Sequence, residues 1–308
     1  VDALADGHRV VIGAIMQHVE AAGNHSGDSA CVLPPYILTD EQMSTVRRHT
    51  ESLGLALHVV GLLNIQYAIH RGTVYVLEVN PRASRTVPFV SKATGRPLAK
   101  IATKVMAGLT LQELGIITEA APRGVAVKEV VLPFVKFPGV DALLGPEMKS
   151  TGEAMGQADS FGAAFAKSSL GCGTALPLSG KALITVNDSD KRAIVPIARQ
   201  LAELGFHLLA TPGTAAALNG AGLAAEIIWK GTAQSPNVTE VMTNGEVALV
   251  INTPFAGNSL HDGTLLRRLA VRNGVPYCTT LTAASAAVEG IRALRQGPLT
   301  PLALQDIH

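Results

Sequence analysis

The sequence predicts a mixed α/β protein with two domains, and three observations support this fold class. The chain has 308 residues, which is long enough for two separate hydrophobic cores. Hydrophobic residues make up 47% of it and aromatic residues only 4%, so aliphatic side chains dominate, as in buried strands of α/β proteins. From about residue 178 onward, short apolar strands alternate with amphipathic helices, which predicts a parallel sheet covered by helices on both faces.

The N-terminal half contains a predicted β-hairpin. Residues 62–70 and 73–80 alternate as strands do, and only a short connection separates them. Gly72 can adopt the positive φ angle that a tight turn needs. We expect a three-residue loop centred on Gly72, because that loop sets Gln66 opposite Glu78. A two-residue loop would break this register.

Polar side chains follow at a spacing of two where the second strand ends: Glu78, Asn80 and Arg82. In the expected register, Gln66 and Asn64 project from the same face of the otherwise apolar hairpin. Carboxylate and amide oxygens suit Mg²⁺ or Mn²⁺, and a guanidinium suits phosphate. The pattern therefore predicts a site for a metal-bound phosphate. An exposed hairpin in which Glu78 pairs with Arg82 or Arg85 would explain the same residues.

The segment "GNHSGDSA", residues 23–30, is rich in small residues. Gly27 in particular would let backbone N–H groups approach a ligand closely. An ordinary turn before the strand that begins near Cys31 is the alternative interpretation.

In the C-terminal half, the elements follow in a regular order. Strands are expected at residues 181–187, 207–211, 246–254 and 275–280, and helices at residues 189–206, 212–222 and 262–275. Ser189 or Asp190 is the expected N-cap of the first helix, and Gly205 its C-terminal stop. The Gly- and Ser-rich stretch before the first strand predicts a boundary between domains at residues 1–173 and 174–308.

One strand-to-helix junction in this half has the features of an anion site. Thr211, Gly213 and Thr214 lie between a strand end and a helix start, where backbone N–H groups and the helix dipole favour negative charge. A plain capped helix would have the same sequence.

The composition also excludes several classes of protein. The net charge of +1 argues against general nucleic-acid binding, and no apolar run approaches the ~18 residues of a membrane span. The three cysteines form no CxxC pair, which indicates reduced thiols and a cytoplasmic protein. The chain lacks an initiator Met and starts as if within a sheet, so we expect a fragment of a longer polypeptide.

The stretch "EVNPRASRTVPFVSKATGRPLAK", residues 78–100, closely resembles the second ATP-grasp half of carbamoyl-phosphate synthase large chains. The resemblance extends over nearly the whole chain, through "HSGDSACVLPPY", "GLLNIQYAI", "VMAGLTLQELG" and "VKEVVLPFVKFPGVDALLGPEMKSTGEAMG". It implies an α+β ATP-grasp lobe of an ATP-dependent ligase that phosphorylates carbamate to carbamoyl phosphate for arginine and pyrimidine biosynthesis. It also implies a separate glutaminase subunit that supplies ammonia, bicarbonate as a substrate, and an oligomeric intact enzyme.

The resemblance implies a role for each predicted residue. Arg82 would be catalytic and face the transferring phosphate. The residues that would bind ATP are Gly23, Asn24, His25, Ser26, Gln66 and Glu78. The residues that would hold its Mg²⁺ or Mn²⁺ are Gln66, Glu78 and Asn80.

The C-terminal domain resembles the doubly wound methylglyoxal-synthase-like domain of the same family, which is regulatory and binds UMP or IMP. The matching allosteric positions are Lys191, Thr211, Thr214, Lys230 and Asn252. Pro254 replaces a Thr of some relatives, so the identity of the effector stays open. The domain lacks the paired-glycine-Asp motif of true methylglyoxal synthases, so we expect a sensor without chemistry of its own.

The resemblance also implies a second regulatory site, which binds ornithine in some relatives. Its acidic positions correspond to Glu20, Asp28 and Glu129, and two further contacts correspond to Tyr277 and Thr279. Cys278 stands where those relatives have Asp, so we do not expect ornithine activation. Ordinary surface charge is the alternative. For the chain as a whole, the alternative function is that of a nucleotide-binding regulatory module without turnover.

Overall fold

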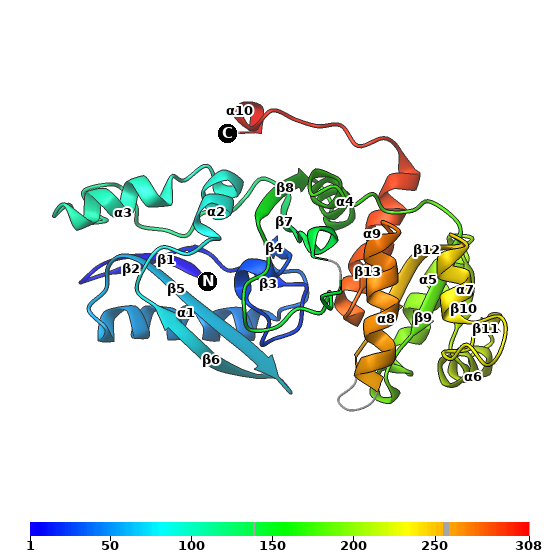
Figure 1. Ribbon diagram of the computed structural model, residues 1–308. Helices are drawn as coiled ribbons and strands as arrows, with labels where there is room; N and C mark the ends of the chain where they lie inside the picture. Colours follow the sequence, from blue (N-terminus) through cyan, green and yellow to red (C-terminus); the bar gives the residue numbers. More distant parts are fainter. Residues whose placement is uncertain (138, 255–258, 308) are drawn as a thin grey trace.

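The computed structural model describes residues 1–137, 139–254 and 259–307, and it contains three β-sheets (Figure 1). Two four-stranded antiparallel sheets form the N-terminal half, in the orders β2-β1-β5-β6 and β3-β4-β7-β8. A five-stranded parallel sheet, β11-β10-β9-β12-β13, forms the C-terminal half. The α/β class is thus confirmed. Among the described residues, no helix has the length and apolarity needed to cross a membrane.

The first sheet contains the predicted hairpin at one edge. Its strands are β1 (Asp2–Asp6), β2 (Val10–Ala14), β5 (Val60–His70) and β6 (Thr73–Asn80). Helix α1 (Asp40–Ala56) packs near it and begins with a capping box between Thr39 and Gln42.

The hairpin has a two-residue loop, so the expected three-residue loop is wrong. His70 pairs with Thr73, and Arg71 and Gly72 both have positive φ angles, as a primed turn requires. A β-bulge then shifts the register between Gln66 and Tyr67, because Leu77 of β6 has no partner in the ladder. The bulge restores the expected pairing: Gln66 lies opposite Glu78, and Asn64 lies opposite Asn80.

The second sheet lies beside the first and shares a core with it. Its strands are β3 (Gln17–His18), β4 (Cys31–Leu33), β7 (Val125–Val131) and β8 (Gly152–Ala158). The other elements of this half are α2 (Val87–Thr94), α3 (Leu98–Met106), α4 (Phe161–Gly171) and the short 3₁₀ turns η1 (Ser26–Asp28) and η2 (Phe134–Lys136). Leu4, Leu33, Phe89 and Leu98 meet in one buried cluster, so both sheets and helices α2 and α3 contribute to the core.

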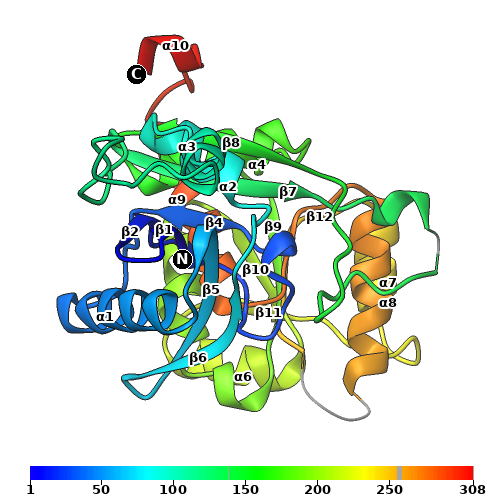
Figure 2. The same ribbon diagram turned by 90° about the vertical axis from the view of Figure 1, so that its left-hand side faces the viewer.

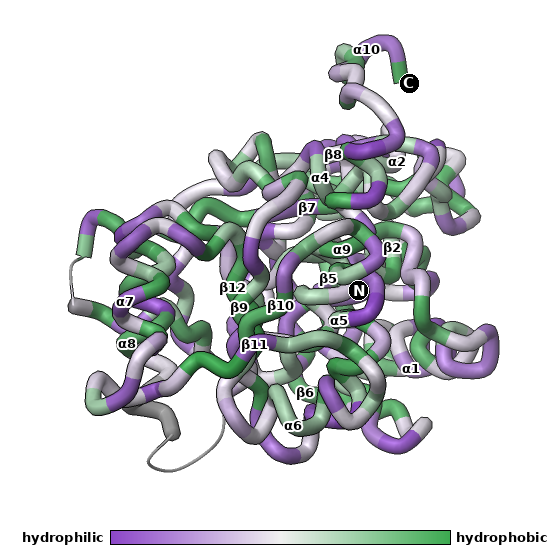
Figure 3. Tube along the Cα trace, turned by 90° about the vertical axis from the view of Figure 1, so that its right-hand side faces the viewer, coloured by the Kyte–Doolittle hydropathy of each residue, from purple (hydrophilic) through white to green (hydrophobic). Residues whose placement is uncertain are grey.

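The C-terminal sheet has helices on both faces, as predicted. Its strands are β9 (Lys181–Thr185), β10 (His207–Ala210), β11 (Ala225–Ile227), β12 (Val247–Asn252) and β13 (Tyr277–Cys278). Leu183, Leu209 and Val250 face α7 (Val238–Thr243) and α8 (Ser259–Arg272), whereas Ala182 and Ile184 face the opposite helix layer. Because both faces of the central strands are covered, β9, β10 and β12 are apolar between their ends, and Figure 3 shows this part of the sheet mainly in green.

The first helix of this half starts later than expected. Asn187, and neither Ser189 nor Asp190, is the capping residue, and it caps a short 3₁₀ turn, η3 (Asp188–Asp190). Helix α5 (Ile194–Glu203) follows, and Gly205 ends it with φ of 74° as predicted. The other helices are α6 (Pro212–Gly220), α9 (Leu281–Gln296) and α10 (Leu304–Ile307), the last of which lies apart from the rest (Figure 1).

Helices α4 and α9 join the two halves. Figure 1 places them side by side in the middle of the molecule, and one buried cluster includes Val32 and Phe165 from the N-terminal half and Ile184 and Val288 from the C-terminal half. The two helix backbones approach closely at Gly162, where an added Cβ would lie 2.3 Å from the carbonyl oxygen of Glu289. A domain boundary after residue 173 therefore stays a prediction, since the hydrophobic core is continuous across it.

Substitution of Gly162 by Ala is expected to destabilise the protein by about 1–3 kcal/mol, because the new methyl group forces α4 away from α9. Urea unfolding of Gly162→Ala measures this change. Gly220→Ala is the matched control, since a Cβ at the end of α6 meets no atom within 4 Å. Equal unfolding midpoints for the two variants would contradict the proposed close packing.

Candidate functional site

The predicted polar cluster lies at the edge of the first sheet, where β6 is the outermost strand of the described residues. Gln66 and Glu78 are cross-strand partners and project from one face. The Asn80 side-chain amide donates a hydrogen bond of 3.0 Å to Oε1 of Glu78. The structure thus brings the three residues Gln66, Glu78 and Asn80 together on a single surface.

Strand β6 is largely exposed although its sequence is mainly apolar. Tyr75, Val76 and Leu77 are 49%, 42% and 48% exposed. They lie on the edge strand around the bulge, whereas Val74 and Val79 pack against buried clusters. An exposed strand explains why Glu78 can remain accessible to a ligand.

Arg82 follows directly after the strand and is exposed. It donates a hydrogen bond to the carbonyl oxygen of Ala83, and Arg85 contacts the sulfur of Met148. Among the described residues, neither arginine forms an ion pair with Glu78. The surface-hairpin alternative is therefore right about the exposure of β6, whereas the ion pair that it expected at Glu78 does not form.

A buried carboxylate fixes the turn that holds Arg82. Asp2 is fully buried and accepts hydrogen bonds from Ser84 Oγ at 2.7 Å, Thr86 Oγ1 at 2.5 Å and Asn64 Nδ2 at 2.8 Å. These bonds tie β1, β5 and the segment after β6 to one another. Because a buried carboxylate is costly without such partners, the network fixes the position of the chain around Arg82.

The segment with Gly23, Asn24, His25 and Ser26 leads into the turn η1. The Nδ1 atom of His25 accepts a hydrogen bond of 3.0 Å from the backbone N–H of Gly27. The N–H group of Gly27 itself is therefore already bonded within the protein. A Cβ at Gly27 would lie 3.0 Å from His25 Nδ1, so glycine at 27 makes room for this ring.

A cavity of about 270 Å³ separates this segment from β5, and Ser26 and Gln66 line it together with Asn64 and His18. The pKa of His18 is lowered to about 4, mainly because the ring is buried. The ring is therefore neutral at pH 7 and adds no positive charge beside Gln66. Glu78, Asn80 and Arg82 do not line the cavity. The structure places them on the exposed hairpin to which Gln66 also belongs.

The donor set fits a hard divalent cation that also binds phosphate. One carboxylate and two side-chain amides offer oxygen ligands, and Asn80 uses its amide N–H₂ to orient Glu78. In the part of the chain that the structure describes, no three His, Cys, Asp or Glu side chains converge on one point. Oxygens from the nucleotide would therefore complete the coordination, as Mg²⁺ commonly requires.

A larger cavity, of about 360 Å³, lies between the two halves of the chain. Glu20 and Glu129 line it from the N-terminal half, and Tyr277, Cys278 and Thr279 line it from the C-terminal half. Burial and the nearby Glu129 raise the pKa of Glu20 to about 7, and Oε2 of Glu20 has no hydrogen-bond partner among the described residues. The pocket thus holds a shielded carboxyl that a ligand could pair with.

Asp28 does not belong to this pocket, although the family pattern groups it with Glu20 and Glu129. It is 1% exposed, and its two oxygens accept hydrogen bonds from the backbone N–H groups of Lys149 and Ser150 at 2.7 and 2.8 Å. Its role in this structure is to hold a loop.

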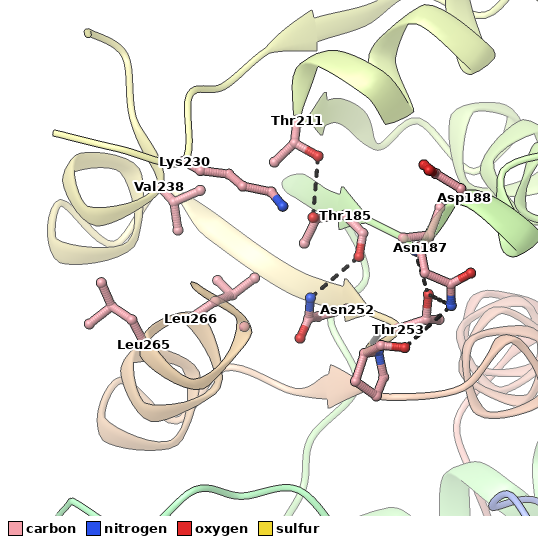
Figure 4. Close-up of a pocket in the computed structure, with 13 residues that line it drawn as sticks. Thr185, Asn187, Asp188, Thr211, Lys230, Val238, Asn252, Thr253, Leu265 and Leu266 are labelled. Carbon is pink, nitrogen blue, oxygen red and sulfur yellow. Dashed lines mark hydrogen bonds between the residues drawn. The ribbon is translucent and has the colours of Figure 1, made fainter. Parts of the chain in front are cut away.

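A third cavity, of about 210 Å³, lies at the carboxyl ends of strands β9, β10 and β12 (Figure 4). Three of the positions that the resemblance implies as allosteric, Thr211, Lys230 and Asn252, line it. Figure 4 shows the Lys230 ammonium directed towards Thr185 and Thr211, whose hydroxyl groups lie 3.2 Å apart. A cation, hydroxyl groups and an amide at this edge of a parallel sheet suit an anionic ligand.

Two of the predicted allosteric residues lie outside the lining. Thr214 is 1% exposed, and its hydroxyl accepts a hydrogen bond from the backbone N–H of Val186. Lys191 forms a 2.6 Å ion pair with Asp188 and lies over Gly213 at the start of α6. Lys191 could therefore reach an anion at this helix end, whereas Thr214 supports the pocket from below.

The sequence analysis missed four polar residues that line this pocket, and one that contacts its lining from behind: Thr185, Asn187, Asp188 and Thr253, and Arg267. Thr185 ends β9 and Asn187 and Asp188 come just after it, so position at the end of a parallel strand could have indicated them. Arg267 is fully buried in α8, and its NH1 donates to Oδ1 of Asn252 at 2.7 Å. No local pattern indicates that contact.

The family models match both halves of the chain. "Carbamoyl-phosphate synthase L chain, ATP binding domain" matches residues 1–114, and "MGS-like domain" matches residues 193–279. The carbamoyl phosphate synthase large chains of Methanothermobacter thermautotrophicus and Pasteurella multocida are 51% and 52% identical over 100% of this chain. The chain spans 29% of the length of these relatives. A solved structure described as "Biotin Carboxylase domain of single-chain bacterial carboxylase" aligns with a TM-score of 0.45 and 14% identity, covering 55% of this chain and 45% of that one.

The raised pKa of Glu20 predicts a pH-dependent stability. The folded state keeps the proton up to about pH 7, whereas the unfolded chain releases it near 4.5, so the free energy of unfolding falls as pH rises between these values. Glu20→Gln removes this loss and should be more stable than the unmodified chain at pH 8, by up to about 3 kcal/mol, with little difference at pH 4. Urea unfolding across this range measures it. Glu203→Gln, at an exposed position, should show no such divergence, and parallel pH profiles for Glu20→Gln and the unmodified chain would contradict the shift.

Proposed function

Because this chain belongs to the family of carbamoyl phosphate synthase large chains and corresponds to their C-terminal part, we propose that it acts within an ATP-dependent ligase that phosphorylates carbamate to carbamoyl phosphate. The observation that supports this most directly is the placement of Gln66, Glu78 and Asn80 on one face of the β5–β6 hairpin, with Arg82 just beyond it. Phosphoryl transfer needs this combination of oxygen ligands and a fixed cation.

Each residue has a role in this proposal. Gln66, Glu78 and Asn80 hold Mg²⁺ or Mn²⁺ on the ATP phosphates, and such an ion would neutralise the charge that develops on them. Arg82 binds the transferring phosphate by its guanidinium, while Ser26 and its neighbours from Gly23 onward lie along the nucleotide. The buried Asp2 network limits the motion of the turn that bears Arg82.

The C-terminal half is proposed to be the regulatory part. Its cavity offers Lys230 and Thr211 to a phosphate group and Asn252 to the rest of a nucleotide such as UMP or IMP. Lys191, at the start of α6, and Thr214, below the pocket, complete the predicted allosteric set. For the whole enzyme we propose a glutaminase subunit as partner, with ammonia and bicarbonate as substrates, in a cytoplasmic oligomer that serves arginine and pyrimidine biosynthesis.

A regulatory module without turnover is the second candidate for the chain by itself. The nucleotide pocket of the C-terminal half has residues on several sides within the described chain. In contrast, Glu78, Asn80 and Arg82 lie on an exposed edge strand and its following turn. Calorimetry with UMP and IMP beside an ATPase assay of this 308-residue chain distinguishes the two candidates.

Substitution of Glu78 by Gln in the complete large chain is expected to lower carbamate phosphorylation by at least about 100-fold, because Glu78 is the carboxylate among the three proposed metal ligands of the described chain. The assay is ATP synthesis from ADP and carbamoyl phosphate. Glu51→Gln, which changes an exposed glutamate of α1, is the matched control and should retain the normal rate. Retention of full activity by Glu78→Gln would refute the assignment of this residue.

Substitution of Lys230 by Met is expected to weaken the binding of UMP by about 10- to 100-fold, because a charge-assisted hydrogen bond to phosphate is lost. Isothermal titration of the 308-residue chain measures the affinity. Lys104→Met alters an exposed lysine of α3 and should leave binding unchanged. Equal affinities for both variants would show that the ligand does not use this pocket.

A further inference from the structure

The connection between β7 and β8 contains a segment, Asp141–Ser150, that we name the strap. It has no regular secondary structure, and Figures 1 and 2 show this part of the chain reaching away from β7 and β8 towards α8. A segment of this kind has few backbone hydrogen bonds of its own. Its position is therefore determined by the bonds that its ends make to other parts of the protein.

One end of the strap is connected through Arg267 to Asn252, which lines the proposed nucleotide pocket. Arg267 forms a bidentate pair with Asp141, through Nε to Oδ1 at 2.7 Å and NH2 to Oδ2 at 2.6 Å. The same guanidinium donates to Asn252, which lines the pocket. Burial opposes ionisation of Asp141, but the hydrogen bonds of Arg267 and Thr264 outweigh it and hold the pKa of that carboxyl below its usual value. The fully buried Arg267 thus connects a pocket residue with the strap by charge-assisted bonds.

Two further bonds hold the strap at the residues just after Asp141. The Tyr277 hydroxyl, which lines the cavity between the two halves, donates to the carbonyl oxygen of Ala142 at 3.3 Å. Lys149 Nζ donates to the carbonyl oxygen of Leu143 at 2.7 Å and closes the strap on itself. The bond between Lys149 and Leu143 links the two ends of the strap and so offers a path by which a displacement of Asp141 can reach the other end.

The other end of the strap holds the turn that contains His25. Four hydrogen bonds join them: His25 N–H to the carbonyl oxygen of Gly145, the N–H groups of Lys149 and Ser150 to the Asp28 carboxylate, and Ser150 Oγ to the carbonyl oxygen of Gly27. These bonds measure 2.8, 2.7, 2.8 and 3.3 Å in that order. Asp28 and Ser150 are buried, so the bonds are shielded from water.

From these contacts we propose that the strap couples the nucleotide pocket to the His25–Asp28 turn: a ligand that engages Asn252 restrains Arg267 and Asp141, and the strap then orders the turn. The regulatory meaning of this coupling rests on the proposed function, in which the turn lies along ATP. The structural coupling itself does not depend on the proposed function, because all the hydrogen bonds between Asn252 and the turn join described residues. Coupling free energies of this kind change a distant equilibrium by about 5- to 150-fold.

Hydrogen–deuterium exchange of the 308-residue chain tests the proposal with the variant Asp141→Asn, which leaves the pocket lining intact. Without ligand, amides of His25, Gly27 and Asp28 should exchange at least about fivefold faster in the variant, whereas strands β9 and β12 stay protected. With UMP as the probe, the unmodified chain should gain protection in this turn, and Asp141→Asn should bind UMP but show no such gain.

Ser150→Ala cuts the strap at its other end and keeps the test informative if Asp141→Asn does not fold. It should speed exchange in the same turn without altering UMP affinity. Glu246→Gln, which removes the half-exposed ion pair with Lys181, is the matched control for loss of a salt bridge. Unchanged exchange in the turn of folded Asp141→Asn and Ser150→Ala would overturn the proposal. Failure of UMP to bind the unmodified chain would instead count against the proposed regulatory pocket, while the ligand-free comparison still decides on the strap.

Discussion

The register between β5 and β6 is the constraint on which the candidate catalytic site depends. A slip of one residue moves every side chain of a strand to the other face, so Glu78 meets Gln66 only in one register. The two-residue turn at Arg71 and Gly72 alone would produce the wrong one. The bulge at Leu77 corrects it, and its position just before Glu78 places the correction between the turn and the polar cluster. Bulges are common beside active sites for this reason.

Buried polar groups fix the loops that no regular element fixes. Asp2 holds the turn after β6, and Asp28 holds the strap. Lys128 is 1% exposed and donates to the carbonyl oxygen of Ser29 at 2.7 Å, which secures the chain just after η1. A buried charge without such partners would be strongly unfavourable, so each of these residues specifies one loop conformation. The segments proposed to bind the nucleotide are thus positioned by carboxylates and an ammonium that bond to other parts of the protein.

Regular elements were predictable from the sequence, whereas the contacts between distant loops were not. The alternation of strand and helix after residue 178 gave the parallel sheet, and the spacing of Gln66, Glu78 and Asn80 gave their common face. The predicted length of the loop at Gly72 was wrong, because the periodic pattern of the sequence does not reveal a single unpaired residue such as Leu77. The predicted start of α5 was wrong because Asn187 caps a separate 3₁₀ turn, η3, and α5 begins only after it, at Ile194, without a side-chain cap. The pairing of Asp141 with Arg267 joins residues 126 positions apart, and no local pattern predicts such a contact. The roles of the individual site residues stay predictions, since they depend on ligands as well as on the fold.

The seam between the two halves limits how a ligand in one can affect the other. Helices α4 and α9 share a close-packed apolar core with both the second and the third sheet, and Gly162 leaves no space for even a methyl group between them. Close-packed cores do not deform continuously, so sliding the C-terminal half as a rigid body would open this core at a large cost. Changes at Asn252 are more readily passed on through irregular segments that are attached to both halves by a few strong bonds. The strap meets this requirement, because Arg267 anchors it on one side and Asp28 on the other, while the hydrophobic seam beside it stays closed.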